Sequence, residues 1–102
     1  MEDDMELNIA LQVDEKDNVA TIFADGITKG TSVRVKDRAG YEEMMSVTEV
    51  IPYGHKVAVR DIQVGEPIIK YGESIGRAVR DIKKGDYVHV HNMEAMRGRG
   101  DL

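Results

Sequence analysis

The sequence predicts a small all-β domain with little helix. Short runs rich in Val and Ile, several of them with apolar and polar residues in alternation, are separated by clusters of Gly, Asp, Asn and Lys. This is the pattern of strands and turns. At 102 residues, of which 41% are hydrophobic, the chain is expected to form one domain with a modest core.

The first half of the chain is expected to hold three strands. Residues 1–6 are highly charged and are expected to form a flexible lead. Apolar residues in 9–13 and 19–23 predict two strands, and the residues between them, 14–18, are of the types that favour a turn. A third alternating stretch, 31–35, predicts the next strand.

The stretch 41–50 leaves two interpretations open. Residues 41–45 have the composition of one helical turn, whereas residues 46–50 have strand character. A Pro-containing turn is predicted at 52–54, where this section ends.

The second half of the chain contains an internal repeat. Residues 58–68 are matched by residues 78–88, and residues 25–33 form a looser third copy with one extra residue. Each copy is expected to build a corner in which Asp accepts nearby backbone N–H groups, Ile enters the core and Gly adopts a positive φ. Such corners change the direction of a strand, so the repeat favours a pseudo-symmetric β-barrel or β-clip with bent strands.

A strand predicted over residues 87–92 carries two of the three histidines. Strict alternation places Val88 and Val90 on the buried face and Tyr87, His89 and His91 on the other. Two adjacent imidazoles are suited to bind a divalent metal such as zinc, iron, nickel or copper. Four candidates stay open for the third ligand: His55, a carboxylate, a substrate oxygen or a residue of another chain. The alternative is that both histidines are simply exposed strand residues.

Composition excludes several classes of function. The formal charge of −5 argues against general binding of nucleic acids or anionic membranes. No apolar run is long enough for a membrane helix and the start is acidic, so a cytoplasmic protein is expected. The absence of cysteine excludes disulfides, thiolate nucleophiles and cysteine-based metal sites. The sequence also lacks a Ser/His/Asp order, catalytic carboxylates at a familiar spacing and a dinucleotide-binding fingerprint.

Several motifs occur together in one order along residues 7 to 101. They are Asp17-Asn18-Val19-Ala20, Gly54-His55-Lys56-Val57-Ala58, Ile69-Lys70-Tyr71-Gly72, Ile75-Gly76, His89-Val90-His91-Asn92 and Arg97-Gly98-Arg99-Gly100-Asp101. In this combination the chain resembles the N-terminal SAF-type β-clip domain of the altronate and galactarate dehydratase family.

The resemblance implies a domain organisation and a function. A SAF β-clip is expected over residues 7–93, and residues 94–102 form a tail that is a candidate docking segment for a large catalytic subunit. In the family this domain is usually fused to a larger catalytic portion, whereas here the chain stops where that portion would begin, so it resembles a separately encoded small subunit. The implied reaction is a β-elimination of water from a sugar acid, with no activity expected from the small subunit alone.

The resemblance also implies which residues act. The expected catalytic residues are His55, His89 and His91. The expected substrate contacts are Lys56, Lys70, Tyr71 and Asn92. A divalent metal, iron in the first place, is implied by the family, with His89 and His91 as candidate ligands.

Two other functions stay open. The small alpha subunit of a sulfolactate sulfo-lyase resembles the same domain, and it belongs to an enzyme that expels sulfite instead of water. The other is a non-catalytic β-clip module that binds a carbohydrate or assists assembly. Exposed strand edges would also favour a homo-oligomer when no partner is present.

Overall fold

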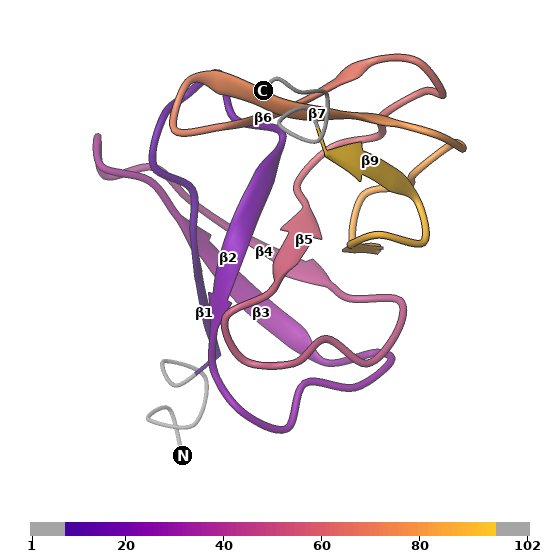
Figure 1. Cartoon of the computed structure of the whole chain (residues 1–102). Coiled ribbons are helices and arrows are strands. Elements are labelled where there is room, and N and C mark those ends of the chain that lie inside the picture. Colours follow the sequence, from indigo (N-terminus) through magenta and orange to yellow (C-terminus); the bar gives the residue numbers. More distant parts are fainter. Residues whose placement is uncertain (1–7, 96–102) are drawn as a thin grey trace.

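A computed structural model describes residues 8–95 and shows an all-β chain (Figure 1). The strands are β1 (Ile9–Leu11), β2 (Val19–Phe23), β3 (Ser32–Lys36), β4 (Glu42–Ser46), β5 (Lys56–Ala58), β6 (Pro67–Lys70), β7 (Glu73–Ala78), β8 (Tyr87–Val88) and β9 (Met93–Ala95). The predicted fold class is confirmed. The predicted lead and the residues of the tail beyond 95 lie outside the described residues.

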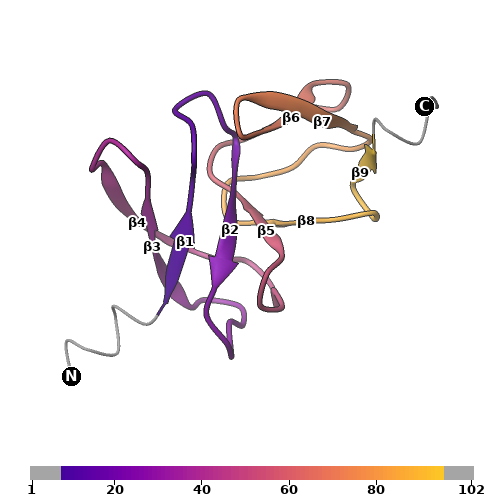
Figure 2. The same cartoon turned by 60° about the vertical axis from the view of Figure 1, so that its left-hand side comes forward.

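Six strands form a curled sheet in the order β4-β3-β1-β2-β5-β8 (Figure 2). Strand β1 is parallel to β3, and the other neighbours are antiparallel. The chain leaving β4 returns to the opposite edge of the sheet, where Thr48 N donates to Gly85 O at 3.0 Å and the Thr48 hydroxyl donates to Asp86 Oδ1 at 2.6 Å. The sheet therefore curls far enough for its two edges to meet through this segment.

A second, three-stranded sheet with the order β6-β7-β9 covers one end of the first (Figure 1). The inside of the curled sheet holds one core cluster, which includes Ile22, Val33 and Val57. A second cluster lies between the two sheets. Its buried members are Val19, Ala58, Ile62, Ile68, Ala78, Ile82 and Val88. Successive residues of β2 and β5 thus enter different clusters, as alternation requires.

The two clear copies of the repeat pair with each other. Ile62 and Ile82 are buried and exchange two backbone hydrogen bonds of 2.8 and 2.7 Å. Gly65 and Gly85 have φ values of 91° and 96°. The predicted corners, with Ile in the core and Gly at positive φ, are confirmed.

The aspartates of the repeat bond across the pair of copies. Asp61 Oδ1 accepts from Lys84 N at 2.9 Å, and Asp81 Oδ1 accepts from Val64 N at the same distance. The sequence analysis expected each carboxylate to accept from N–H groups near its own corner. Each corner is instead tied to the other copy, so the repeat is one reciprocal unit.

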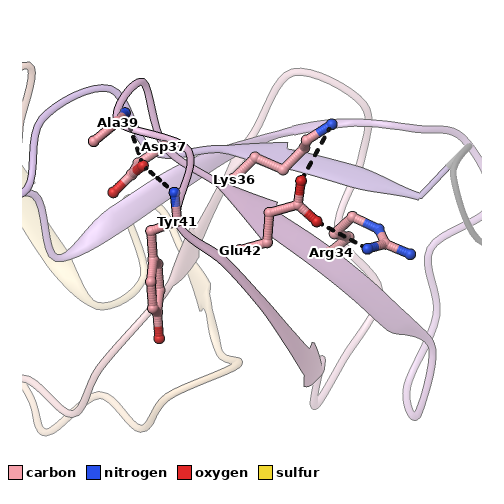
Figure 3. A network of polar contacts seen from close by, with 6 residues as sticks. All are labelled: Arg34, Lys36, Asp37, Ala39, Tyr41 and Glu42. Atoms are coloured by element: carbon pink, nitrogen blue, oxygen red, sulfur yellow. Dashed lines mark hydrogen bonds and ion pairs between the residues drawn. The ribbon is translucent and has the colours of Figure 1, made fainter.

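The hairpin of β3 and β4 settles the ambiguous stretch 41–50. All five residues of β4 pair with β3, so the helical interpretation of residues 41–45 is wrong. The Glu42 carboxylate pairs with Arg34 at 2.9 Å and with Lys36 at 3.8 Å, and the turn is closed by Asp37 (Figure 3). Strand character at 46–50 is limited to Ser46, and the chain then leaves the hairpin.

The end of the described chain is also paired. Glu94 and Ala95, which the sequence analysis places in the tail, belong to β9 and pair with β7. Within residues 8–95 there is no helix of the length and apolar character needed to cross a membrane.

Candidate active site at the ends of β5 and β8

Two histidines meet where β5 begins and β8 ends. In the antiparallel pair, Lys56 lies opposite Val88 and Val57 lies opposite Tyr87. One further step along this register places His55 opposite His89, because paired residues advance together along antiparallel strands. Their ring centroids are 5.0 Å apart. Pairing of β5 with β8 therefore brings together two imidazoles that are distant in sequence.

The strand predicted over residues 87–92 is shorter than expected. Only Tyr87 and Val88 are in strand β8, and residues 89–92 form a turn. His89 O accepts from the N–H groups of Asn92 and Met93 at 3.0 and 2.9 Å. Val88 is buried as predicted, but Val90 is 77% exposed, so its expected place on the buried face is wrong.

Asn92 holds this turn. Its side chain is buried, accepts from His89 N at 3.0 Å and donates to Tyr87 O at 2.8 Å. Asparagine is a common turn residue because its side chain bonds nearby backbone groups in this way. The predicted contact of Asn92 with a substrate stays a prediction, while the geometry gives the side chain a role in positioning the backbone of His89.

Tyr87 is the site residue that the sequence analysis did not assign. Its hydroxyl is 2.8 Å from Nδ1 of His55, and its ring is stacked on His89 with an interplanar angle of 8°. Its backbone N–H donates to the Glu49 carboxylate at 3.2 Å. Alternation placed Tyr87 on the same face as His89, and this signal was sufficient to identify it. No sequence signal pointed to Glu49.

Two lysines bring positive charge to this region. Lys56 on β5 is half-buried, and its charge lies close enough to His89 to affect the pKa of that histidine. Burial, and then the charge of Lys70, lower the pKa of Lys56. A small region of positive charge thus lies in a chain that is acidic overall.

The surroundings of His89 disfavour its protonated form. Burial lowers the pKa of His89, and repulsion from Lys56, and from His55 and His91 when they are protonated, lowers it further. These surroundings therefore favour the neutral form of His89 at pH 7. A neutral imidazole has one nitrogen with a free lone pair, so it is able to accept a proton or bind a metal.

The remaining predicted residues lie at the edge of this group. His91 is exposed in the turn, and its ring centroid is 5.4 Å from that of Tyr87. Tyr71 is 60% exposed in the β6–β7 turn with a positive φ of 58°, and Lys70 Nζ lies 5.0 Å from its ring centroid. Within residues 8–95, Tyr71 is connected to the histidines through Lys70, which lies near Lys56, and through Lys56, which lies near His89.

The donor set of this chain does not complete a metal site by itself. Among residues 8–95, no group of three or more His, Asp or Glu side chains is arranged to hold a metal ion. The rings of His89 and His91 each pack on Tyr87. The expected contacts of His89 and His91 with a metal, and its identity as iron, stay predictions and enter no step below.

We compared the sequence with protein families and with known proteins. Residues 8–96 match the altronate/galactarate dehydratase SAF domain family. The (2R)-sulfolactate sulfo-lyase subunit alpha of Chromohalobacter salexigens is 39% identical over 88 residues, which are 82% of this chain and 90% of that protein. The altronate dehydratase of Escherichia coli K12 is 38% identical over 80% of this chain, and the galactarate dehydratase (L-threo-forming) of the same organism is 40% identical over 76%. This chain spans only 15% and 14% of the length of those two dehydratases.

Proposed function

Since the chain belongs to the altronate/galactarate dehydratase SAF domain family, we propose that it is the small component of a lyase that removes water from a sugar acid. The observation that carries this proposal is the group of three histidines and two lysines at the ends of β5, β6 and β8. Imidazoles transfer protons near neutral pH, and lysines attract carboxylates. Both properties are needed for the elimination of water from a hydroxy acid.

The proposed reaction is a β-elimination. Lys56 and Lys70 attract the substrate carboxylate, and neutral His89 takes the proton from the carbon next to it. The carbon–oxygen bond at the adjacent carbon breaks and a carbon–carbon double bond forms. The departing hydroxyl takes a proton from a second imidazole, which starts in its protonated form, and leaves as water. The resulting enol rearranges to a keto-acid. His55 and His91 are the candidates for the second imidazole.

We also propose that a larger catalytic chain or segment completes the site. The dehydratases that this chain matches are about seven times longer than the matched region, as their coverage of 15% and 14% implies. His91 and Val90 are exposed at the rim of the histidine group, where a partner would be able to cover them. Any metal required by the reaction would be held with the help of that partner.

A second candidate is the alpha subunit of a (2R)-sulfolactate sulfo-lyase. One observation favours it: this chain covers 90% of such a subunit at 39% identity. The same residues would then bind sulfolactate, and sulfite would leave in place of water.

The test is to recover the assembled enzyme and measure its reaction. The full chain serves as bait, and the purified complex is assayed with hexonates, hexarates and sulfolactate. Release of a keto-acid from one sugar acid supports the dehydratase, and release of sulfite from sulfolactate supports the second candidate. If no large chain is captured and no lyase activity is found, the chain is a non-catalytic binding module and the proposal is wrong.

The variant His91→Ala tests the role of the histidines in that complex. The side chain is exposed, so the variant is expected to fold normally and to lose at least about tenfold in kcat. The matched control is Tyr41→Ala. This variant also removes an exposed ring, but one that lies in the turn between β3 and β4, outside the site. Equal activity of the two variants would remove His91 from the mechanism.

A further inference from the structure

We infer that Tyr87 is a positioning residue that fixes the orientation and the tautomer of His55. This inference rests on the proposed function only for its catalytic consequence. Among the described residues, Tyr87 contacts all three histidines, with ring centroids 5.5 Å from His55, 5.5 Å from His89 and 5.4 Å from His91.

The ring of Tyr87 is itself fixed by the fold. Tyr87 lies in β8 opposite Val57, and its ring packs against the core cluster inside the curled sheet. Its backbone N–H donates to Glu49, and its backbone oxygen accepts from Asn92. Because packing fixes its ring and hydrogen bonds fix its backbone, Tyr87 is able to restrict the orientation of His55.

The hydrogen bond to His55 has a preferred direction. A tyrosine hydroxyl can donate one hydrogen bond and can also accept. The hydroxyl of Tyr87 lies 2.8 Å from Nδ1 of His55, which is its hydrogen-bond partner among residues 8–95. With the hydroxyl as the donor, its proton is bonded to an unprotonated Nδ1. The ring proton of His55 is then on Nε2, because neutral imidazole carries one N–H.

This tautomer gives His55 and His89 different roles in the proposed reaction. His55 offers an Nε2–H hydrogen bond to an anionic oxygen of the substrate, while neutral His89 accepts the proton from carbon. His91 is then the imidazole that gives a proton to the departing hydroxyl. Without the hydroxyl of Tyr87, the His55 ring would rotate more freely and populate both tautomers. Tyr87 therefore acts through His55, and its removal is expected to slow the reaction more than it weakens substrate binding.

The first test is nitrogen-15 NMR of the histidine rings in the full chain. In the unmodified protein at pH 8, Nδ1 of His55 is expected to resonate as an unprotonated, hydrogen-bonded nitrogen. A proton on Nδ1 would overturn the inference without any variant. In Tyr87→Phe, which keeps the packed ring, the resonance is expected to move toward that of an unbonded nitrogen, and an unchanged resonance would also overturn the inference.

The second test is kinetic and uses the assembled lyase. Tyr87→Phe is expected to lower kcat about tenfold or more and to leave KM within about twofold. The matched control is Tyr41→Phe, which removes an exposed hydroxyl that bonds Glu43 and not a histidine. Normal kcat in Tyr87→Phe would overturn the catalytic consequence. If the NMR result holds but no lyase activity exists, the proposed function fails and the positioning role stands.

Discussion

His89 is the residue whose chemistry depends most on its neighbours. Burial lowers its pKa, and so does repulsion from Lys56 and from His55 and His91 when they are protonated. Protonation is thus easier in the unfolded chain, where the ordinary value is about 6.5. Consequently this residue lowers the stability of the fold as the pH falls from about 6.5 toward the lowered pKa, and the loss is fully present below that value. At pH 7 and above the effect is small.

An NMR titration of His89 in the full chain provides the measurement. The midpoint is expected below 6.5, and Lys56→Gln is expected to raise it because one of the nearby positive charges is removed. Lys36→Gln is the control, since Lys36 lies on β3, which β1 and β2 separate from β5. A midpoint at or above 6.5, or an equal effect of both variants, would contradict this account.

Asn92 is expected to matter for stability. Its buried amide bonds backbone groups of His89 and Tyr87, and Asn92→Ala leaves these groups without their partner. The loss is expected to be about 1–3 kcal/mol in the free energy of unfolding, measured by urea denaturation. The matched control for Asn→Ala is the half-buried Asn8, whose amide makes one long bond of 3.4 Å to Ser32 O. Similar losses for the two variants would mean that the turn does not depend on Asn92.

At the scale of single elements, sequence patterns predicted strands well where apolar residues were consecutive or alternated. Strand β2 has the predicted bounds, and β1 and β3 differ by one or two residues. The stretch around β4 failed because Glu42 to Ser46 do not alternate in character, so that only pairing with β3 defines the strand. The stretch 87–92 failed for the opposite reason: its alternation is real, but the hydrogen bonds of Asn92 bend the chain after Val88.

The two corner glycines offer a prediction with an internal control. Gly65 and Gly85 occupy equivalent positions of the repeat and have similar positive φ values. A Cβ added at Gly65 meets nothing within 4 Å, whereas one added at Gly85 would lie 2.5 Å from Ser46 O. Gly65→Ala is expected to cost about 1–2 kcal/mol for its backbone conformation, and Gly85→Ala is expected to cost about 1–3 kcal/mol more for the clash.

Thermal and urea denaturation of the two variants measure this difference. The backbone strain is common to both, so the excess loss in Gly85→Ala reports the close approach between the start of β8 and the chain that leaves β4. If the two variants lose the same free energy of unfolding, the chain near Ser46 moves away from residue 85 without cost, and the close approach does not matter for stability.

At the scale of the whole molecule, the repeat indicated pseudo-symmetry, but it did not indicate that the two copies pair with each other. Asp61 and Asp81 occupy the same position in the two copies, which indicated two corners. This match did not show that each carboxylate would accept a hydrogen bond from the other copy. The same limit applies to the site. Alternation grouped Tyr87 with His89, but His55 joined them only through the register of β5 with β8, which no local pattern encodes.

The open position of the histidine group leads to a prediction for the isolated protein. His91 and Val90 project at the rim of the site, and the charged neighbours Lys56 and Lys70 are only partly buried. A β-elimination needs a site that holds the substrate and excludes water, because electrostatic stabilisation is much weaker in bulk solvent. The purified chain is therefore expected to be folded but to release no measurable keto-acid or sulfite, whereas a complex with the proposed large partner is expected to do so. Circular dichroism establishes the fold, and the same substrate panel measures turnover. Robust turnover by the chain alone would mean that these residues form a complete active site without a partner.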